Sequence, residues 1–240
     1  MKNKQIFAFA AWAVLSAPAP AAPEVYLDEA SFLNELAAMG YTTLHEGFEY
    51  DAVWGTVRSP DTAAAVSSQG AIWTSNNLSS EITTSNGAAL TGDWGFYSSP
   101  HGSYGEPDPG ASCFNPEECG DGFRLTANSG VFVAVGSWVM TNTPFAKLGM
   151  YLGNYPDNAL DLGETCDPPG SENCFGNDVL GTESRFFGVI DPAGFERIEY
   201  RELEGKLEPP GGGDLKYIFA DDFYFGLDDG EIIFSDGYED

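Results

Sequence analysis

The chain has 240 residues, and its 37 acidic residues against 10 Lys and Arg give a formal net charge of −27. A surface of that sign repels nucleic acid and anionic lipid, which excludes both as partners. Hydrophobic residues make up 42% of the chain, enough for a folded core, so global disorder is excluded as well.

The first 21 residues have the pattern of a secretory signal peptide. Lys2 and Lys4 precede an apolar run over residues 6–16, and Ala19-Pro20-Ala21 satisfies the small-x-small rule, which predicts cleavage after Ala21. The apolar run is too short to span a membrane, and no second candidate follows it. We therefore expect a secreted, periplasmic or extracellular protein without a membrane span.

One amphipathic helix is expected directly after this segment, over residues 28–39. Phe32, Leu33, Leu36 and Met39 recur at helical spacing, acidic residues stand at the start, and Gly40 follows as a stop signal.

The rest of the chain alternates polar with aromatic or β-branched residues, and Asn, Gly, Asp and Pro separate the alternating segments. Segment 185–201 reads as a hairpin around Asp191-Pro192-Ala193-Gly194. The pattern predicts an all-β, two-sheet jelly-roll-like β-sandwich over residues 22–226, with 227–240 as an acidic tail or edge strand. The expected strands are 42–48, 53–58, 71–74, 80–84, 94–98, 123–127, 131–141, 145–152, 185–190, 196–201, 215–225 and 231–234.

Two long segments without strand character, 100–122 and 155–182, each hold one pair of cysteines. In an exported protein four cysteines favour disulfides, and pairing nearest neighbours would close two small loops, although three connectivities are possible. A zinc site is the rival interpretation, but the spacing is not C-x-x-C and both histidines are distant. The cysteines are Cys113, Cys119, Cys166 and Cys174.

Two segments, HEGFEYDAVW (45–54) and YIFADDFYFG (217–226), place carboxylates among aromatic residues that are typical of core strands. A sandwich often pairs its first strand with its last, which would bring Glu46, Glu49, Asp221 and Asp222 together. Four close carboxylates raise one another's pKa unless a cation neutralises them, and calcium accepts such oxygen ligands. The sequence therefore predicts a calcium site, unless these acids occupy the solvent faces of edge strands.

The stretches EGFE (46–49) and FADDFYFG (219–226) resemble the first and last strands of calcium-containing jelly-roll domains of bacterial exported proteins. That group includes carbohydrate-binding modules and proteins with a C-terminal sorting tag. The resemblance covers about residues 28–226 and implies a structural calcium bound by Glu49 and by Asp222 or Asp221, with Glu46 as an additional carboxylate. The chain departs from the tagged proteins because it has no C-terminal hydrophobic helix with a basic end.

No catalytic residue is assigned. The only histidines are His45 and His101, and neither G-x-S-x-G, HExxH nor a phosphate-cradling glycine loop occurs. The segment 91–108 joins Trp94, Tyr97 and Tyr104 to a polar, Gly-rich loop, a composition that suits stacking against sugar rings. Strand alternation offers a competing interpretation for Trp94, which would lie in the core beside Phe96.

These observations favour an exported, non-catalytic binding protein with a glycan as its most plausible ligand. One alternative is a structural or adhesive surface protein without a small ligand, and another is a glycoside-active enzyme. An exposed aromatic patch near Asn or Asp would favour the first hypothesis, and core-buried tryptophans under a flat acidic surface the second. A deep cleft with two facing carboxylates would favour the third.

Overall fold

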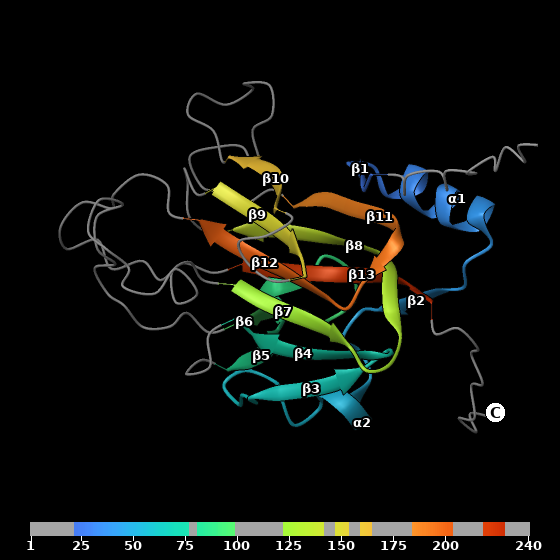
Figure 1. Cartoon of the computed structure of the whole chain (residues 1–240). Helices are drawn as coiled ribbons and strands as arrows, with labels where there is room; N and C mark the ends of the chain where they lie inside the picture. The colour runs from blue at the N-terminus through green and yellow to red at the C-terminus, as the bar shows by residue number, and fades with distance from the viewer. Residues whose placement is uncertain are drawn as a thin grey trace, which may run out of the picture.

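The computed structural model describes residues 22–76, 81–98, 122–141, 147–153, 159–164, 184–203 and 218–228. Two sheets of antiparallel strands face each other, and one helix lies on the outside of the sandwich (Figure 1). This arrangement confirms the predicted all-β, two-sheet jelly-roll-like sandwich with a short N-terminal helix. No helix among the described residues is long and apolar enough to cross a membrane.

Among the described residues, sheet A has seven strands and sheet B has six. Along sheet A the order is β1 (Glu24–Tyr26), β11 (Arg185–Phe195), β8 (Val131–Thr141), β13 (Ile218–Asp228), β6 (Gly95–Ser98) and β5 (Ile82–Ser85), and β2 (Thr43–Glu46) also pairs with β13. Along sheet B the order is β10 (Ala159–Glu164), β9 (Lys147–Leu152), β12 (Arg197–Leu203), β7 (Gly122–Ala127), β4 (Ala71–Ser75) and β3 (Ala65–Ser68). The helices are α1 (Glu29–Met39), α2 (Asp51–Trp54) and a 3₁₀ turn, η1 (Asn86–Ala88).

The predicted strand at 53–58 is wrong, because the short helix α2 occupies the first part of that segment. The backbone N–H groups of Trp54 and Gly55 donate to the carbonyls of Tyr50 and Asp51 at 2.9 and 2.8 Å. This helical turn directs the Trp54 side chain into the core, where it is fully buried. Packing in the core thus outweighs the preference of this aromatic residue for a strand.

The predicted hairpin at 185–201 is also wrong. Strands β11 and β12 do not pair with each other, since β11 belongs to sheet A and β12 to sheet B. The Asp191–Gly194 stretch lies inside β11, where the register with β8 shifts between Ile190 and Phe195. There the Ala193 N–H donates to the Asp191 carboxylate at 3.0 Å, and Gly194 has a positive φ of 77°. The turn composition therefore marks an irregularity within one strand and not a hairpin between two.

Three strands were not expected: β1, β3 and β10, the last of which lies within the segment 155–182 that was interpreted as lacking strands. The described remainder of the predicted strands is confirmed, with shifts of at most three residues at their ends except that β11 continues to Phe195.

The main core lies between the sheets and is rich in aromatic rings. Phe48 lies at its centre, with ring centroids of Trp54, Trp73, Phe96 and Phe223 at 5.0, 5.2, 5.4 and 6.0 Å. All five side chains are fully buried. Edge-to-face and stacked pairs at these distances add to the free energy of apolar burial.

A second, smaller core lies on the outer face of sheet A, under α1. Asp28 caps this helix by accepting the Ser31 N–H at 2.8 Å. Phe32 lies over Gly136 of β8 and Gly188 of β11, where an added Cβ would come within 2.7 and 2.5 Å of the Phe32 ring. The two glycines thus form a notch that seats α1 on β8 and β11.

Strand β13 changes its partner on one edge halfway along its length. It pairs with β6 at Phe219 and Ala220 and with β2 at Phe223–Gly226, while β8 pairs along its other edge. The predicted pairing of the early strand with the late one is therefore confirmed. Where the partner changes from β6 to β2, the register of β13 with β8 shifts between Asp221 and Tyr224, and Asp222 adopts a positive φ of 47°. We call this irregularity, Asp221 and Asp222, the β13 bulge.

Candidate functional site

The β13 bulge fixes the loop that precedes β6. Asp221 is almost fully buried, and its Oδ2 accepts the N–H groups of Leu90 and Thr91 at 2.7 and 3.1 Å. Its Oδ1 accepts the N–H of Asp222 at 2.8 Å. Burial raises the pKa of the Asp221 carboxyl to about 6, and these three backbone N–H groups limit the rise.

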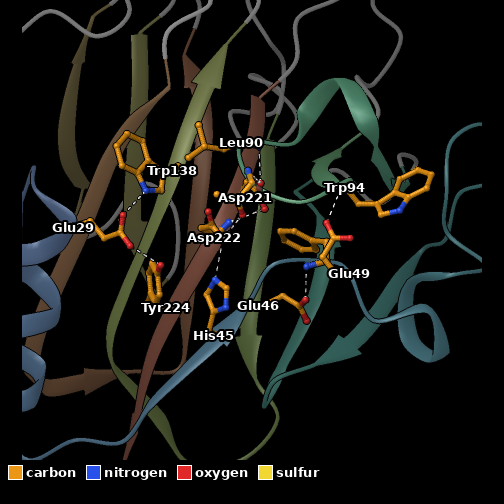
Figure 2. A network of polar contacts seen from close by, with 12 residues as sticks. Glu29, His45, Glu46, Glu49, Leu90, Trp94, Trp138, Asp221, Asp222 and Tyr224 are labelled. Carbon is orange, nitrogen blue, oxygen red and sulfur yellow. Dashed lines mark hydrogen bonds and ion pairs between the residues drawn. The ribbon is translucent and has the colours of Figure 1, made fainter.

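Asp222 faces β2 and the same loop. One of its oxygens lies 2.9 Å from His45 Nε2 and accepts the Thr91 hydroxyl at 3.1 Å (Figure 2). The contact with Asp222 raises the pKa of His45, which also stacks on the Tyr224 ring at 4.8 Å between centroids. His45 and Asp222 therefore form a partly buried pair beside the bulge.

The two predicted glutamates, Glu46 and Glu49, both accept hydrogen bonds from backbone N–H groups. The buried Glu46 accepts the N–H of Phe48 at 2.6 Å and the hydroxyl of Ser68. Glu49 Oε1 accepts the N–H groups of Asp93 and Trp94, both at 2.8 Å. Both carboxylates thus hold main-chain donors near the start of β6 and the end of β2.

Each of the four carboxylates predicted as calcium ligands has a hydrogen-bonding role of its own, with Asp221 and Asp222 in the β13 bulge and Glu46 and Glu49 at and after the end of β2. In the part of the chain that the structure describes, each of them accepts N–H or O–H hydrogen bonds. No group of three or more His, Cys, Asp or Glu side chains that could hold a metal ion occurs among the described residues. The calcium site remains a prediction.

The outer face of sheet A carries a row of aromatic side chains beside the bulge. Phe219 of β13 lies opposite Tyr97 of β6 on one side and Met140 of β8 on the other. Trp138 lies two residues along β8 and is paired with Asp221. Alternation buries the intervening Phe96, Val139 and Ala220 in the main core. We call Tyr97, Phe219, Met140 and Trp138 the aromatic patch.

The members of the aromatic patch are half-buried. The Tyr97 and Phe219 rings are 5.6 Å apart, and the Tyr97 hydroxyl donates to Ser59 Oγ at 3.3 Å. A shallow depression lies between Trp138, Met140, Phe219 and the exposed Leu90, with Asp221 and Ser184 among its polar lining residues. The patch thus offers partly accessible ring surface next to the hydroxyl of Ser184, whereas the Asp221 carboxylate is buried and accepts backbone N–H groups.

The residues predicted to bind a ligand are not all on this face. Tyr97 belongs to the aromatic patch, whereas Trp94 packs against the main core with the Arg58 guanidinium 4.1 Å above its ring. Tyr104 and His101 lie outside the described residues, and so do Cys113, Cys119, Cys166 and Cys174, so the disulfide prediction also lies there.

The sequence prediction did not assign Phe219, Met140, Trp138 or Tyr224 to the binding site. Alternation indicated that Trp138 and Met140 share one face of their strand, but it predicted opposite faces for Phe219 and Tyr224, which the β13 bulge brings to the same outer face. Which strands lie side by side depends on sheet order, and β6, β13 and β8 are separated by long intervals of sequence. The patch could therefore be recognised only from the tertiary structure.

Comparisons with known proteins yield architectural likeness alone. No protein-family model and no curated protein matches the chain. The K1 cleaved adhesin domain of Lys-gingipain from Porphyromonas gingivalis W83 has a TM-score of 0.41 and 17% identity, over 78% of this chain and 99% of that chain.

A family 29 carbohydrate-binding module has a TM-score of 0.34 and 10% identity, over 77% of this chain and 88% of that chain. The enzymatically active domain of bacteriophage CBA120 tailspike protein 4 has a TM-score of 0.29 and 14% identity, over 76% of this chain and 21% of that chain. These similarities are too low to assign a function or a ligand to this chain.

Proposed function

We propose that this chain is an exported, non-catalytic binding protein that binds a glycan on the aromatic patch. The observation that carries the proposal is the placement of Tyr97, Phe219 and Trp138 on three adjacent strands, with their rings half-buried. A ring that is packed on one side and accessible on the other supplies a rigid apolar surface at low entropic cost.

The surroundings of the patch support an uncharged sugar rather than an anionic one. Strands two positions apart are separated by about 10 Å, and two residues along a strand by about 7 Å, so Tyr97 and Trp138 span about 12 Å. That length accommodates a short oligosaccharide lying across the strands. The net charge of −27 and the nearby carboxylates of Glu29, Asp221 and Asp222 disfavour uronate or sulfate groups.

A structural or adhesive role without a small ligand is the second candidate. It is favoured by the complete burial of Trp54 and Trp73, which leaves these two large rings inaccessible to any ligand. The depression beside the patch is shallow, which does not favour a glycoside-cleaving site.

The test of glycan binding uses residues 22–240 against arrayed neutral, amino and acidic oligosaccharides. Phe219→Ala and Tyr97→Ala are expected to weaken binding about tenfold each, because each removes one stacking surface. Tyr50→Ala is the matched control, since Tyr50 is an exposed aromatic residue that precedes α2 and lies outside the patch. Absence of binding by the unmodified protein would contradict the glycan proposal, and equal loss in the control would contradict the patch.

We also propose that a calcium ion binds beside the β13 bulge, with Glu49 and Asp222 as ligands. The proposal is supported by the contact of both carboxylates with the loop before β6, where Asp222 accepts the Thr91 hydroxyl and Glu49 accepts the Asp93 and Trp94 N–H groups. Calcium can complete its coordination with backbone carbonyls and water. Buried carboxylates next to one another are stabilised in the ionised form by a cation.

Calcium at a hundredfold excess over its Kd is expected to stabilise the fold by about 2.7 kcal/mol relative to EDTA. Equilibrium unfolding in urea measures this difference. Glu49→Ala and Asp222→Ala should abolish it, whereas Glu35→Ala on the exposed side of α1 should not. Equal stability in calcium and EDTA would mean that these carboxylates serve only as hydrogen-bond acceptors.

A further inference from the structure

Glu29 connects α1 to the edge of the aromatic patch. It is the first residue of the helix, directly after the N-cap Asp28, and it is half-buried. Its carboxylate lies over sheet A, between Trp138 and Tyr224 (Figure 2). A first-turn glutamate interacts favourably with the helix dipole, but that effect does not require contact with a sheet.

Both oxygens of the Glu29 carboxylate accept a hydrogen bond from an aromatic side chain. Oε2 accepts the indole Nε1–H of Trp138 at 2.9 Å, and Oε1 accepts the hydroxyl of Tyr224 at 2.5 Å. Trp138 is on β8 and Tyr224 is on the neighbouring β13. One carboxylate therefore holds two rings on adjacent strands.

The position of Glu29 is itself set by the seat of the helix. Phe32, one turn further along α1, occupies the notch over Gly136 and Gly188, and Leu36 is buried in the same small core. Because Gly136 is two residues from Trp138 on β8, the helix anchor and the carboxylate contact lie next to each other on one strand.

The two rings differ in what they contact next. The Trp138 indole meets Phe186 edge-on at 5.9 Å and lines the depression with Phe219. The Tyr224 ring stacks on His45, which pairs with Asp222 of the β13 bulge. Burial and the Glu29 contact raise the pKa of Tyr224, so its hydroxyl stays protonated and remains a donor at neutral pH.

We propose that Glu29 is a positioning residue of the aromatic patch, which fixes the Trp138 indole in the orientation that a ligand contacts. This role rests on the proposed glycan-binding function of the patch. Without the carboxylate, the indole N–H loses its acceptor and the ring is free to leave the orientation that borders the depression. A ring that must be ordered on binding lowers affinity by the entropy of that ordering.

Glutamine at position 29 provides the conservative substitution. Its amide oxygen can accept the Trp138 Nε1–H, and its NH₂ group can donate to the Tyr224 hydroxyl oxygen, because a phenol both donates and accepts. Leucine has a similar size but can make neither bond. Glu35→Leu is the matched control, because Glu35 is exposed on the same helix.

The first measurement needs no ligand. The indole Nε1–H resonance of Trp138, assigned by its disappearance in Trp138→Phe, is followed by ¹H–¹⁵N NMR in each variant. We expect Glu29→Leu to move this resonance and speed its exchange with water, whereas Glu29→Gln and Glu35→Leu leave it protected. A Trp138 resonance that is the same in Glu29→Leu and the unmodified protein overturns the contact itself, whatever the protein binds.

The second measurement is the Kd for the best oligosaccharide from the array. Glu29→Leu is expected to weaken binding about tenfold, and Glu29→Gln to restore it to within about twofold. A moved resonance with an unchanged Kd overturns the positioning role. Loss of binding in Glu29→Gln despite a protected indole also overturns it, because a retained contact should then suffice. No binding by the unmodified protein overturns the proposed function, a result that the NMR measurement distinguishes from failure of the contact.

Discussion

Replacement of Phe48 by alanine is expected to lower the free energy of unfolding by about 3–5 kcal/mol. The ring is fully buried and contacts four other aromatic rings, so its removal leaves a cavity at the centre of the main core. Rigid aromatic neighbours from α2, β4, β6 and β13 cannot all move inward to fill that space. The lost transfer free energy and the cavity therefore both contribute.

The backbone of Phe48 makes a second, separable contribution. Its φ is 61°, in the left-handed region that a bulky residue seldom occupies. Two side chains hold this conformation: Glu46 accepts the Phe48 N–H at 2.6 Å, and Arg58 donates to the Phe48 carbonyl at 2.7 Å. Arg58 also pairs with Asp51 at 3.0 Å. Hydrogen bonds to its N–H and its C=O thus hold Phe48 in a strained backbone conformation that directs the ring into the core.

Comparison of Phe48→Ala with Phe48→Gly separates these two effects. Both variants lose the ring, but glycine adopts a positive φ without the penalty of about 1 kcal/mol that alanine pays there. Phe48→Gly should therefore be the more stable of the two in urea-induced unfolding, and Tyr50→Ala should be close to the unmodified protein. If the alanine variant were instead the more stable, residue 48 would not be held in the left-handed region.

Stability is expected to rise as the pH is lowered from 7, because Asp221 is buried. Its folded pKa of about 6 lies above the value of 3.8 for an exposed carboxyl, so the folded state binds a proton that the unfolded state does not. The stabilising contribution is complete below pH 3.8 and is lost as the pH rises through about 6. The whole effect is about 3 kcal/mol, of which about 1 kcal/mol is regained between pH 7 and 5.

His45 acts in the same direction. Its contact with Asp222 raises its pKa, so its contribution is present below its unfolded value and disappears as the pH rises through the folded value. Besides Asp221, the carboxylates whose charges act on His45 are those of Asp222 and Glu46.

Urea unfolding between pH 5 and 7 in EDTA should show the rise in stability. Asp221→Asn and His45→Gln should each reduce the slope. An unchanged slope in Asp221→Asn would contradict burial of this carboxyl. Bound calcium should flatten the slope of the unmodified protein, because the cation keeps the carboxylates ionised.

The amino-acid sequence by itself determined the local features of this protein. Asp28 and Gly40 delimit the helix because a side-chain acceptor at the N-cap and a left-handed glycine at the C-terminus act within one turn of chain. Period-two alternation places Phe96 in the core and Tyr97 outside, since successive side chains of a strand point to opposite faces. The same alternation identified Thr42–Phe48 and the ADDF segment as strands, and these two strands pair in the structure.

The tertiary structure alone decided which faces meet. Trp54 reaches the core through a helical turn where its β-favouring neighbourhood predicted a strand, because filling the centre of the sandwich outweighs a propensity of less than about 1 kcal/mol. The Asp191–Gly194 stretch forms an irregularity within β11 and not a hairpin, because β11 pairs with β8 on both sides of it and β12 belongs to the other sheet. The aromatic patch depends on β13 lying between β6 and β8, and the contact of Glu29 with Trp138 joins residues 109 positions apart. Such pairings follow from the packing of whole sheets, which is a property of the chain's global free energy and is not encoded in any local stretch.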